Sequence, residues 1–130
     1  MALTHFCWHC YAQNERPDGL CARCGEEIAE PADTTFDDRL LWALRHPIPE
    51  RRMVAVRALA RRRAGRAREP LHELATRADD PYLAAAALEA LVELDGIEPH
   101  RALVAGLARQ GPAPVRRVAS VLDTGRRSPT

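Results

Sequence analysis

A unit of about 32 residues recurs three times in the C-terminal two thirds of this chain. A shift of 32 positions carries Pro49 onto Pro81, Ala55 onto Ala87, Leu59 onto Leu91 and Ala87 onto Ala119. A repeat of this length is typical of solenoids, in which one unit buries its apolar face only by stacking against its neighbours. The repeat therefore constrains the fold more than any other feature of the sequence.

Each unit has the apolar spacing of two helices joined by a turn. Apolar residues recur three or four positions apart, as they do along one face of an amphipathic helix. Each of the six predicted helices presents one apolar face. The faces are Leu40, Leu41 and Leu44; Met53, Val54, Val56, Leu59 and Ala60; Leu71, Leu74, Ala75 and Ala78; residues 82–94; Leu103, Val104, Leu107 and Ala108; and Val115, Val118, Ala119, Val121 and Leu122. Aromatic residues make up only 5% of the chain, and alanine and leucine supply the apolar content, which favours helix over sheet.

The first helix is expected to begin at a capping box. Thr35 can cap the helix with its hydroxyl, and Asp38 follows three residues later. At the other end of the repeats, Asp123 stands where the second unit has Leu91. A terminal repeat needs a polar outer face, so we expect the solenoid to end there and residues 124–130 to form a flexible tail.

The middle unit, DDPYLAAAALEALVEL, resembles the HEAT-repeat pattern of Asp-Pro followed by alanine and leucine at helical spacing. The matching residues are Asp80, Pro81, Leu83, Ala87, Ala90, Leu91 and Leu94. The arginine of that pattern is missing at Ala84, although Arg116 restores it in the third unit. The unit is shorter than the usual repeat and is similar to the short bacterial HEAT-like class. The resemblance implies a mainly α fold, with a short α-solenoid of three HEAT-like helical hairpins over residues 36–123.

All the cysteines of the chain lie near its N-terminus, in two Cys-x-x-Cys pairs. They are Cys7, Cys10, Cys21 and Cys24. Gly25 follows the second pair and can take a positive φ angle, and Pro17-Asp18-Gly19 is typical of a turn. Two such knuckles joined by a turn resemble a short zinc ribbon, although the ten-residue gap is tighter than the generic pattern. Four thiolates around Zn²⁺ leave no open position, so the predicted zinc site is structural. We expect the ribbon to span residues 1–27, followed by an acidic linker over residues 28–35.

Three other cysteine chemistries remain as alternatives. Four thiolates also hold iron in a rubredoxin-like site, although zinc suits a ribbon this small better. The run from Cys7 to Cys10 has the spacing of a redox pair, but such a pair needs a βαβ setting that this sequence lacks. Two disulfides would require export, and the N-terminal run MALTHFCWHC has no features of a signal peptide.

Three aromatic residues, Phe6, Trp8 and Tyr11, surround the first cysteine pair. They can pack on the ribbon and dock it against the first helical pair, or they can form an exposed binding patch. We favour packing, because so small a module has few other apolar side chains.

The net charge of +1 conceals an uneven distribution of charge. Residues 47–68 hold eight arginines and one acid, and residues 69–100 hold one arginine and eight acids. The basic band is Arg51–Arg68; Arg57 and Arg61 share one helix face, and Arg62, Arg63 and Arg66 follow the helix end. The shift of 32 places Glu89 and Glu93 opposite Arg57 and Arg61. Ion pairs between neighbouring repeats are therefore one interpretation, and an arginine surface for an acidic partner or nucleic acid is the other.

Nothing in the sequence indicates catalysis. The chain has no lysine and no glycine-rich phosphate loop, and His46, His72 and His100 lie on different predicted helices. We expect His72 and His100 to be solvated. The chain has no apolar run of about 18 residues, so we expect no membrane span and a cytoplasmic location.

The predicted function is a non-enzymatic protein–protein interaction module, an adaptor or scaffold with structural Zn²⁺. The expected partner is another protein with an acidic surface, and no membrane or small-molecule substrate is expected. The predicted partner-binding residues are Arg57, Arg61, Arg62, Arg63 and Arg66. The alternative is a nucleic-acid-binding protein that uses the Arg51–Arg68 band. A third class, an accessory to an enzyme such as the HEAT-like lyases of bilin chromophores, follows from the resemblance alone.

Overall fold

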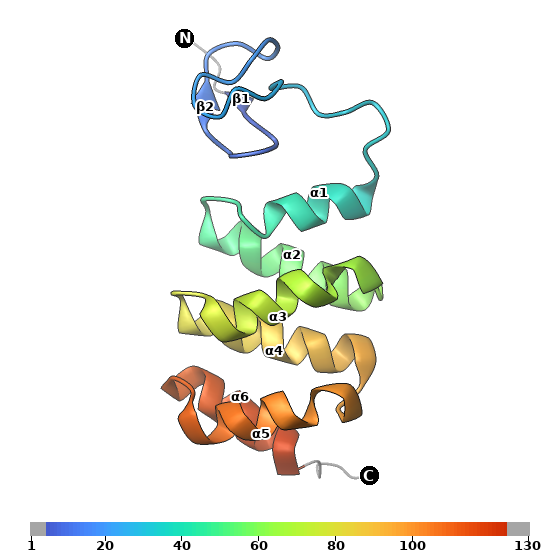
Figure 1. The fold of residues 1–130 in the computed structure, drawn as a ribbon, viewed down its shortest axis with the longest axis vertical. Coiled ribbons are helices and arrows are strands. Elements are labelled where there is room, and N and C mark those ends of the chain that lie inside the picture. Colours follow the sequence, from blue (N-terminus) through green and yellow to red (C-terminus); the bar gives the residue numbers. More distant parts are fainter. Residues whose placement is uncertain (1–4, 125–130) are drawn as a thin grey trace.

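Six α-helices follow one another in the computed structural model, which describes residues 5–124 of the chain (Figure 1). They are α1 (Phe36–Ala43), α2 (Pro49–Arg61), α3 (Arg68–Arg77), α4 (Pro81–Asp95), α5 (Arg101–Gln110) and α6 (Ala113–Thr124). Consecutive helices pair as hairpins, and the three hairpins stack in sequence order below a small N-terminal module. The predicted mainly helical fold of three hairpins is confirmed. Val54 and Val121, however, which the spacing placed on the apolar faces, are each 63% exposed. Of the predicted tail, residues 125–130 lie outside the described residues.

Two short 3₁₀ helices, which the sequence analysis did not predict, introduce the second and third hairpins. They are η1 (Gly65–Ala67) before α3 and η2 (Glu98–His100) before α5. A 3₁₀ turn often leads into an α-helix. Each one here leads directly into the first helix of its hairpin.

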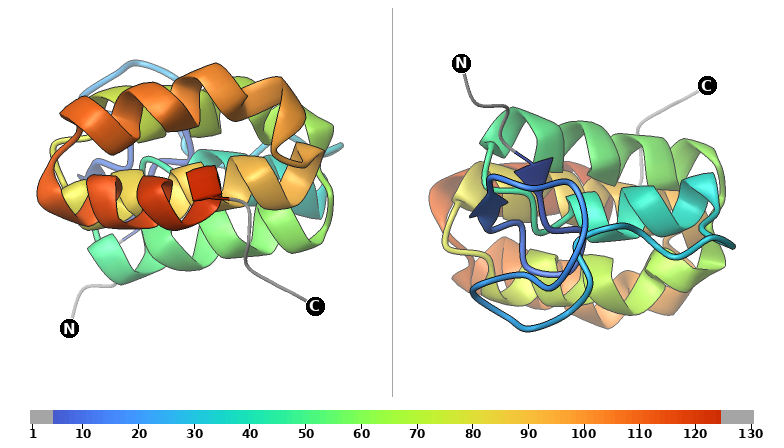
Figure 2. Two further views of the ribbon diagram at one scale, coloured as in Figure 1. Left: turned by 90° about the horizontal axis from the view of Figure 1, so that it is seen from below. Right: turned by 90° about the horizontal axis from the view of Figure 1, so that it is seen from above.

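The second helices of the hairpins form a continuous row. α2 packs against α4 and α4 packs against α6, whereas α1, α3 and α5 make few contacts with one another. Seen from below, α6 lies over α4 (Figure 2). One buried alanine stands at the same position of each helix in the row: Ala55, Ala87 and Ala119. These small side chains let the helix backbones approach closely, which is why the 32-residue period is visible in the sequence.

Helix α4 is the centre of the core because it is covered from both sides. All six residues from Leu83 to Leu88 are buried, as are Ala90, Leu91 and Leu94. Its start is capped by Asp80, whose Oδ1 accepts hydrogen bonds from the amides of Tyr82 (2.9 Å) and Leu83 (3.4 Å). Gly96 ends the helix with a φ angle of 81°, which side chains other than glycine rarely adopt.

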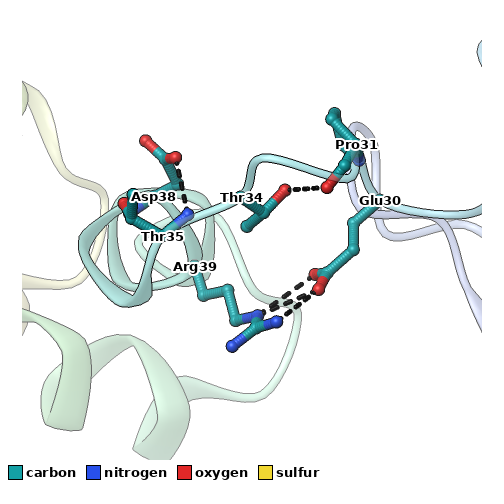
Figure 3. A network of polar contacts seen from close by, with 6 residues as sticks. All are labelled: Glu30, Pro31, Thr34, Thr35, Asp38 and Arg39. Atoms are coloured by element: carbon teal, nitrogen blue, oxygen red, sulfur yellow. Dashed lines mark hydrogen bonds and ion pairs between the residues drawn. The ribbon is translucent and has the colours of Figure 1, made fainter.

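The predicted capping box at the start of α1 is confirmed. The amide of Asp38 donates to Thr35 Oγ1 at 3.1 Å, and the amide of Thr35 donates to Asp38 Oδ2 at 3.0 Å (Figure 3). The segment before it is held by Glu30, whose carboxylate accepts from Arg39 Nη2 at 2.6 Å. Ile28, the first residue of the predicted linker, is buried against Cys7 and Cys21 of the N-terminal module.

The C-terminal end of the stack is polar, as the sequence analysis predicted from Asp123. Three buried residues of α4 have exposed equivalents in α6, which no further hairpin covers within the described residues. The buried residues are Ala84, Leu88 and Leu91, and their repeat equivalents in α6 are Arg116, Ser120 and Asp123. The outer face of the last described hairpin is therefore hydrophilic, as a terminal repeat requires.

One carboxylate joins the second hairpin to the third. Asp95, at the end of α4, accepts two hydrogen bonds of 2.7 Å from Arg68, at the start of α3. His100 Nε2 lies 2.8 Å from the same carboxylate. The prediction of a solvated His100 is wrong, because only 7% of this residue is exposed. His72 is exposed, as predicted.

Replacing Asp95 with asparagine is expected to destabilise the helical stack by about 2 kcal/mol at neutral pH. The pKa of Asp95 is lowered from its ordinary 3.8 to about 2, chiefly by the hydrogen bond from Arg68 and also by that from His100. A carboxyl whose pKa is lower in the folded state stabilises that state above its unfolded pKa, and this contribution is lost as pH falls through the folded value. Denaturation followed by circular dichroism should therefore show that wild type and Asp95→Asn converge between about pH 4 and pH 2. An exposed control, Asp79→Asn, should leave stability unchanged; a constant gap at every pH would contradict this prediction.

Candidate functional site

The N-terminal module consists of two equivalent knuckles related by a shift of 14 residues. In the first, the amide of Tyr11 donates to the carbonyl of Cys7 at 2.8 Å. In the second, the amide of Gly25 donates to the carbonyl of Cys21 at 3.0 Å. Each knuckle closes a tight turn around one Cys-x-x-Cys pair, so the two pairs have the same local geometry.

The strand pairing of the module follows the same shift. Strand β1 (His5–Phe6) pairs antiparallel with β2 (Gln13–Asn14), with Phe6 opposite Gln13. In the second knuckle, an antiparallel bridge joins Leu20 to Glu27, the residues 14 positions on. These short pairs hold the base of each knuckle and direct its two cysteines to the same side.

A left-handed residue follows the second cysteine of each pair. Gly25 has a φ angle of 82°, which confirms the sequence prediction, and Tyr11 holds the equivalent position at 60°. Tyrosine rarely adopts this conformation, and the sequence analysis did not predict it there. The shift of 14 was the signal that could have revealed it.

The four thiols meet in one cluster. The Sγ atoms of Cys7, Cys10, Cys21 and Cys24 all lie within 4.8 Å of one another. The Sγ atoms of Cys7 and Cys24 are 3.7 Å apart, as are those of Cys10 and Cys21, so each short contact joins the two knuckles. All four cysteines are free thiols, without disulfides. The cluster can bind a metal ion such as zinc.

Polar groups of the module point at the sulfur atoms. The amide of Arg23 lies 3.4 Å from Cys21 Sγ, and Asn14 Nδ2 lies 3.5 Å from the same atom. Backbone hydrogen bonds, those with Cys24 and Arg23 first, lower the pKa of the Cys21 thiol to about 6. The amide of Glu26 lowers the pKa of Cys24, but burial and hydrogen bonds with the neighbouring thiols outweigh it and raise that pKa to about 12. Without a cation, the cluster therefore does not favour four thiolates together.

Aromatic rings dock the module onto the first hairpin. The rings of Trp8 and Trp42 are 4.7 Å apart between centroids, and those of Tyr11 and His46 are 4.9 Å apart. Phe6 lies 5.8 Å from the same histidine ring. The packing predicted for the three aromatic residues is confirmed, although Phe6 remains 40% exposed.

Three arginines of the Arg51–Arg68 band are held by acids of the chain itself. Arg62 pairs with Asp37, Arg66 with Asp38 and Arg68 with Asp95. Arg62 also lies over the ring of Phe36, 4.8 Å from its centroid. Because each of these arginines faces a carboxylate, its positive charge is largely compensated.

Arg57 and Arg61 are exposed on the outer surface of α2 and line a groove of about 260 Å³ with Glu89 and Glu93 of α4. The expected ion pairs are not formed: within residues 5–124, no ion pair of 4.0 Å or less joins either arginine to either glutamate. Long exposed side chains gain little from pairing in water, so proximity alone does not fix their geometry. Arg63, also exposed, follows α2. Partner binding by these arginines stays a prediction.

The helical part of the chain matches a known family. The model of the family described as HEAT repeats matches residues 38–123. Comparison with curated proteins gave no match, and comparison with solved structures gave none either. Across residues 5–124, none of the helices is both long enough and apolar enough to span a membrane. Since the match covers most of the chain and all three helical hairpins, the chain belongs to the HEAT repeat family.

Proposed function

We propose that this protein is a non-enzymatic interaction module that binds an acidic protein partner and holds a structural zinc ion at its N-terminus. The observation that supports this proposal most directly is the row of second helices in a HEAT repeat chain, with Arg57 and Arg61 exposed on its surface. HEAT repeats generally mediate protein–protein interaction, and the family is typically a scaffold without catalytic activity.

The donor set and spacing of the cysteine cluster support zinc. A tetrahedron of sulfur atoms about 2.3 Å from a central Zn²⁺ has edges of roughly 3.8 Å. The two contacts of 3.7 Å between knuckles fit those edges. Bound there, zinc would join the two knuckles and supply folding energy to a module whose buried core is small. Four protein ligands leave no position for a substrate, which supports a structural role.

The charges of the second-helix row support an acidic partner. Arg57 and Arg61 stand one turn apart, and within the described residues neither is part of an ion pair. A partner carboxylate can therefore bind either guanidinium without first displacing an internal acid. The nearby Glu89 and Glu93 would restrict the acidic face of the partner to the α2 side of the groove.

Reversing the charge of Arg57 and Arg61 to glutamate is expected to weaken partner binding at least tenfold. The assay is capture of partners on the immobilised zinc-loaded protein, followed by titration of the recovered partner. Arg109→Glu, an exposed charge reversal on α5, is the matched control and should bind as wild type does. Equal binding by the double variant and the control would remove the arginines from the interface.

Nucleic-acid binding is the second candidate, since Arg51, Arg57, Arg61 and Arg63 stay outside the ion pairs of the described residues. Their neighbours Arg62, Arg66 and Arg68 are compensated by acids, which reduces the charge available for phosphates. Fluorescence anisotropy with duplex DNA and single-stranded RNA at about 50 and 200 mM salt separates the two functions. Tight binding that collapses at the higher salt would favour nucleic acid, and no binding at the lower salt would leave the protein partner.

A further inference from the structure

A groove lies between α1 and α2 at the N-terminal end of the helical stack, next to the cysteine module. Its volume is about 440 Å³. Its lining consists of Leu40, Ala43, Val54 and Ala55 together with the polar residues Arg39, His46, Glu50 and Arg51. We call it the end groove. We propose that the end groove is a second docking surface, which takes an amphipathic helix of a partner protein with an acidic polar face.

The repeat shows which positions of a second helix a preceding repeat covers. α4 has a preceding hairpin, and its Leu83 and Ala86 are 4% and 7% exposed. Their equivalents in α2 are Arg51 and Val54, and both are exposed, Val54 to 63%. α2 therefore presents to solvent the side that in α4 packs against a neighbouring helix. In α4, the equivalent side is covered by an α-helix, so an α-helix is the shape that fits the uncovered side of α2.

The uncovered sides of the first and the last hairpin differ in polarity. At the C-terminal end, the α6 positions whose equivalents in α4 are buried carry Arg116, Ser120 and Asp123, none of them apolar. The exposed Val121 stands where α4 has Glu89, which is exposed as well. At the N-terminal end, Val54 remains apolar, above an apolar floor of Leu40 and Ala55 that is buried. A terminal repeat with a polar outer face would carry a polar residue at the position of Val54. A valine at 63% exposure beside a groove is instead typical of a binding surface.

The cysteine module borders the end groove and does not fill it. The ring of His46, which lines the groove, packs against the tilted rings of Phe6 and Tyr11. Seen from above, the module leaves most of α2 in view (Figure 2). Phe6 and Ile48 flank the groove with 40% and 42% exposure. The apolar surface therefore continues from the module onto the start of α2.

The charges around the end groove favour an acidic partner. Arg39 is compensated by Glu30. Arg51 and its neighbour Arg52 have no ion pair within the described residues and outnumber Glu50, the one acid of the lining. Burial, and then the charges of Arg51 and Arg52, lower the pKa of His46, so this ring adds no positive charge of its own near neutral pH. The guanidinium of Arg51 is thus the unpaired positive charge of the lining, which a partner carboxylate would meet at the edge of the apolar floor.

The test uses the full zinc-loaded chain and three synthetic helical peptides of about 18 residues. One has a leucine and alanine face and a glutamate face, the second replaces glutamate by arginine, and the third scrambles the first. We expect the glutamate peptide to bind at least tenfold more tightly than the other two by fluorescence anisotropy. Val54→Glu should weaken that binding at least tenfold, and Val121→Glu should change it less than twofold. Val121 is the matched control, because this valine on α6 is also 63% exposed.

The remaining outcomes each decide the proposal. Equal binding of the three peptides, or equal loss in the two valine variants, would overturn it. If the chain dimerises and Val54→Glu dissociates the dimer, the occupant is a second copy and the partner helix is wrong. If the peptide binds only after deletion of residues 1–4, the occupant is that segment. The Arg57→Glu/Arg61→Glu variant should bind the peptide normally, so that failure of the proposed arginine interface and failure of the end groove are distinguishable.

Discussion

Replacing Cys21 with serine is expected to abolish stoichiometric zinc binding and to unfold the N-terminal module, while the helical signal of the chain is largely kept. Cys21 is buried at 3% exposure, its Sγ is 3.7 Å from that of Cys10, and it also accepts the Asn14 side-chain amide. A structural zinc site in a small domain contributes roughly 10–16 kcal/mol of binding free energy, which is also the folding free energy of that domain. The helical hairpins have their own core and do not need this contribution.

The measurements are metal content by mass spectrometry and circular dichroism of the helices. The wild type should hold one zinc per chain, and Cys21→Ser should hold much less with nearly unchanged helicity. Tryptophan fluorescence gives a second readout, because Trp8 leaves the ring of Trp42 when the module unfolds. Ala22→Ser, an exposed change beside the site, should keep both the zinc and the fluorescence. Full zinc occupancy in Cys21→Ser would show that the four-cysteine site is wrong, and full occupancy by iron in the wild type would change the identity of the metal.

The helical repeats could be predicted from sequence because their signal is both local and repeated. Apolar spacing identifies a helix, and the shift of 32 identifies which positions of successive hairpins are equivalent. Ala55, Ala87 and Ala119 are buried at one equivalent position because close approach of the second helices tolerates only a small side chain there. The capping box of Thr35 and Asp38 was predictable for a related reason, since all its atoms belong to four consecutive residues.

Contacts between side chains distant in the chain could not be predicted in the same way. The carboxylate of Asp95 contacts both Arg68 and His100. These two residues are 32 positions apart, so they occupy the same position in successive hairpins. That equivalence was present in the sequence, but nothing local placed a carboxylate between the two residues. The expected ion pair between Arg57 and Glu89 is absent for a different reason. The repeat brings both residues to one groove, but it does not determine the conformation of long, exposed side chains.

The cysteine site shows the same division. Spacing predicted which four residues would cluster, because two Cys-x-x-Cys knuckles leave few other arrangements. The geometry of the first knuckle was hidden, because Tyr11 adopts a left-handed conformation that sequence preference assigns to glycine or asparagine. The aromatic residues of the module predicted that it packs against the first hairpin. Only the structure shows that they do so through Trp42 and His46.

Truncating Leu88 to alanine is expected to lower the free energy of unfolding by about 2–5 kcal/mol, a large share of the stability of a small domain. Leu88 has no exposed surface and lies on the central helix α4, covered from both sides, so the cavity it leaves cannot close easily. Urea denaturation followed by circular dichroism at neutral pH gives the difference.

The repeat supplies the control for this prediction. Ser120 is the equivalent of Leu88 in α6, but it is exposed at the polar end of the stack, so Ser120→Ala should change stability by less than about 0.5 kcal/mol. The same two positions test whether the stack ends at α6. A loss from Ser120→Ala as large as that from Leu88→Ala would mean that this face is buried in solution against a further helix. Leu88 and Ser120 occupy the same position within the repeat, but only Leu88 is covered by a following hairpin. The difference between the stability changes of the two variants therefore measures how much this coverage contributes to stability.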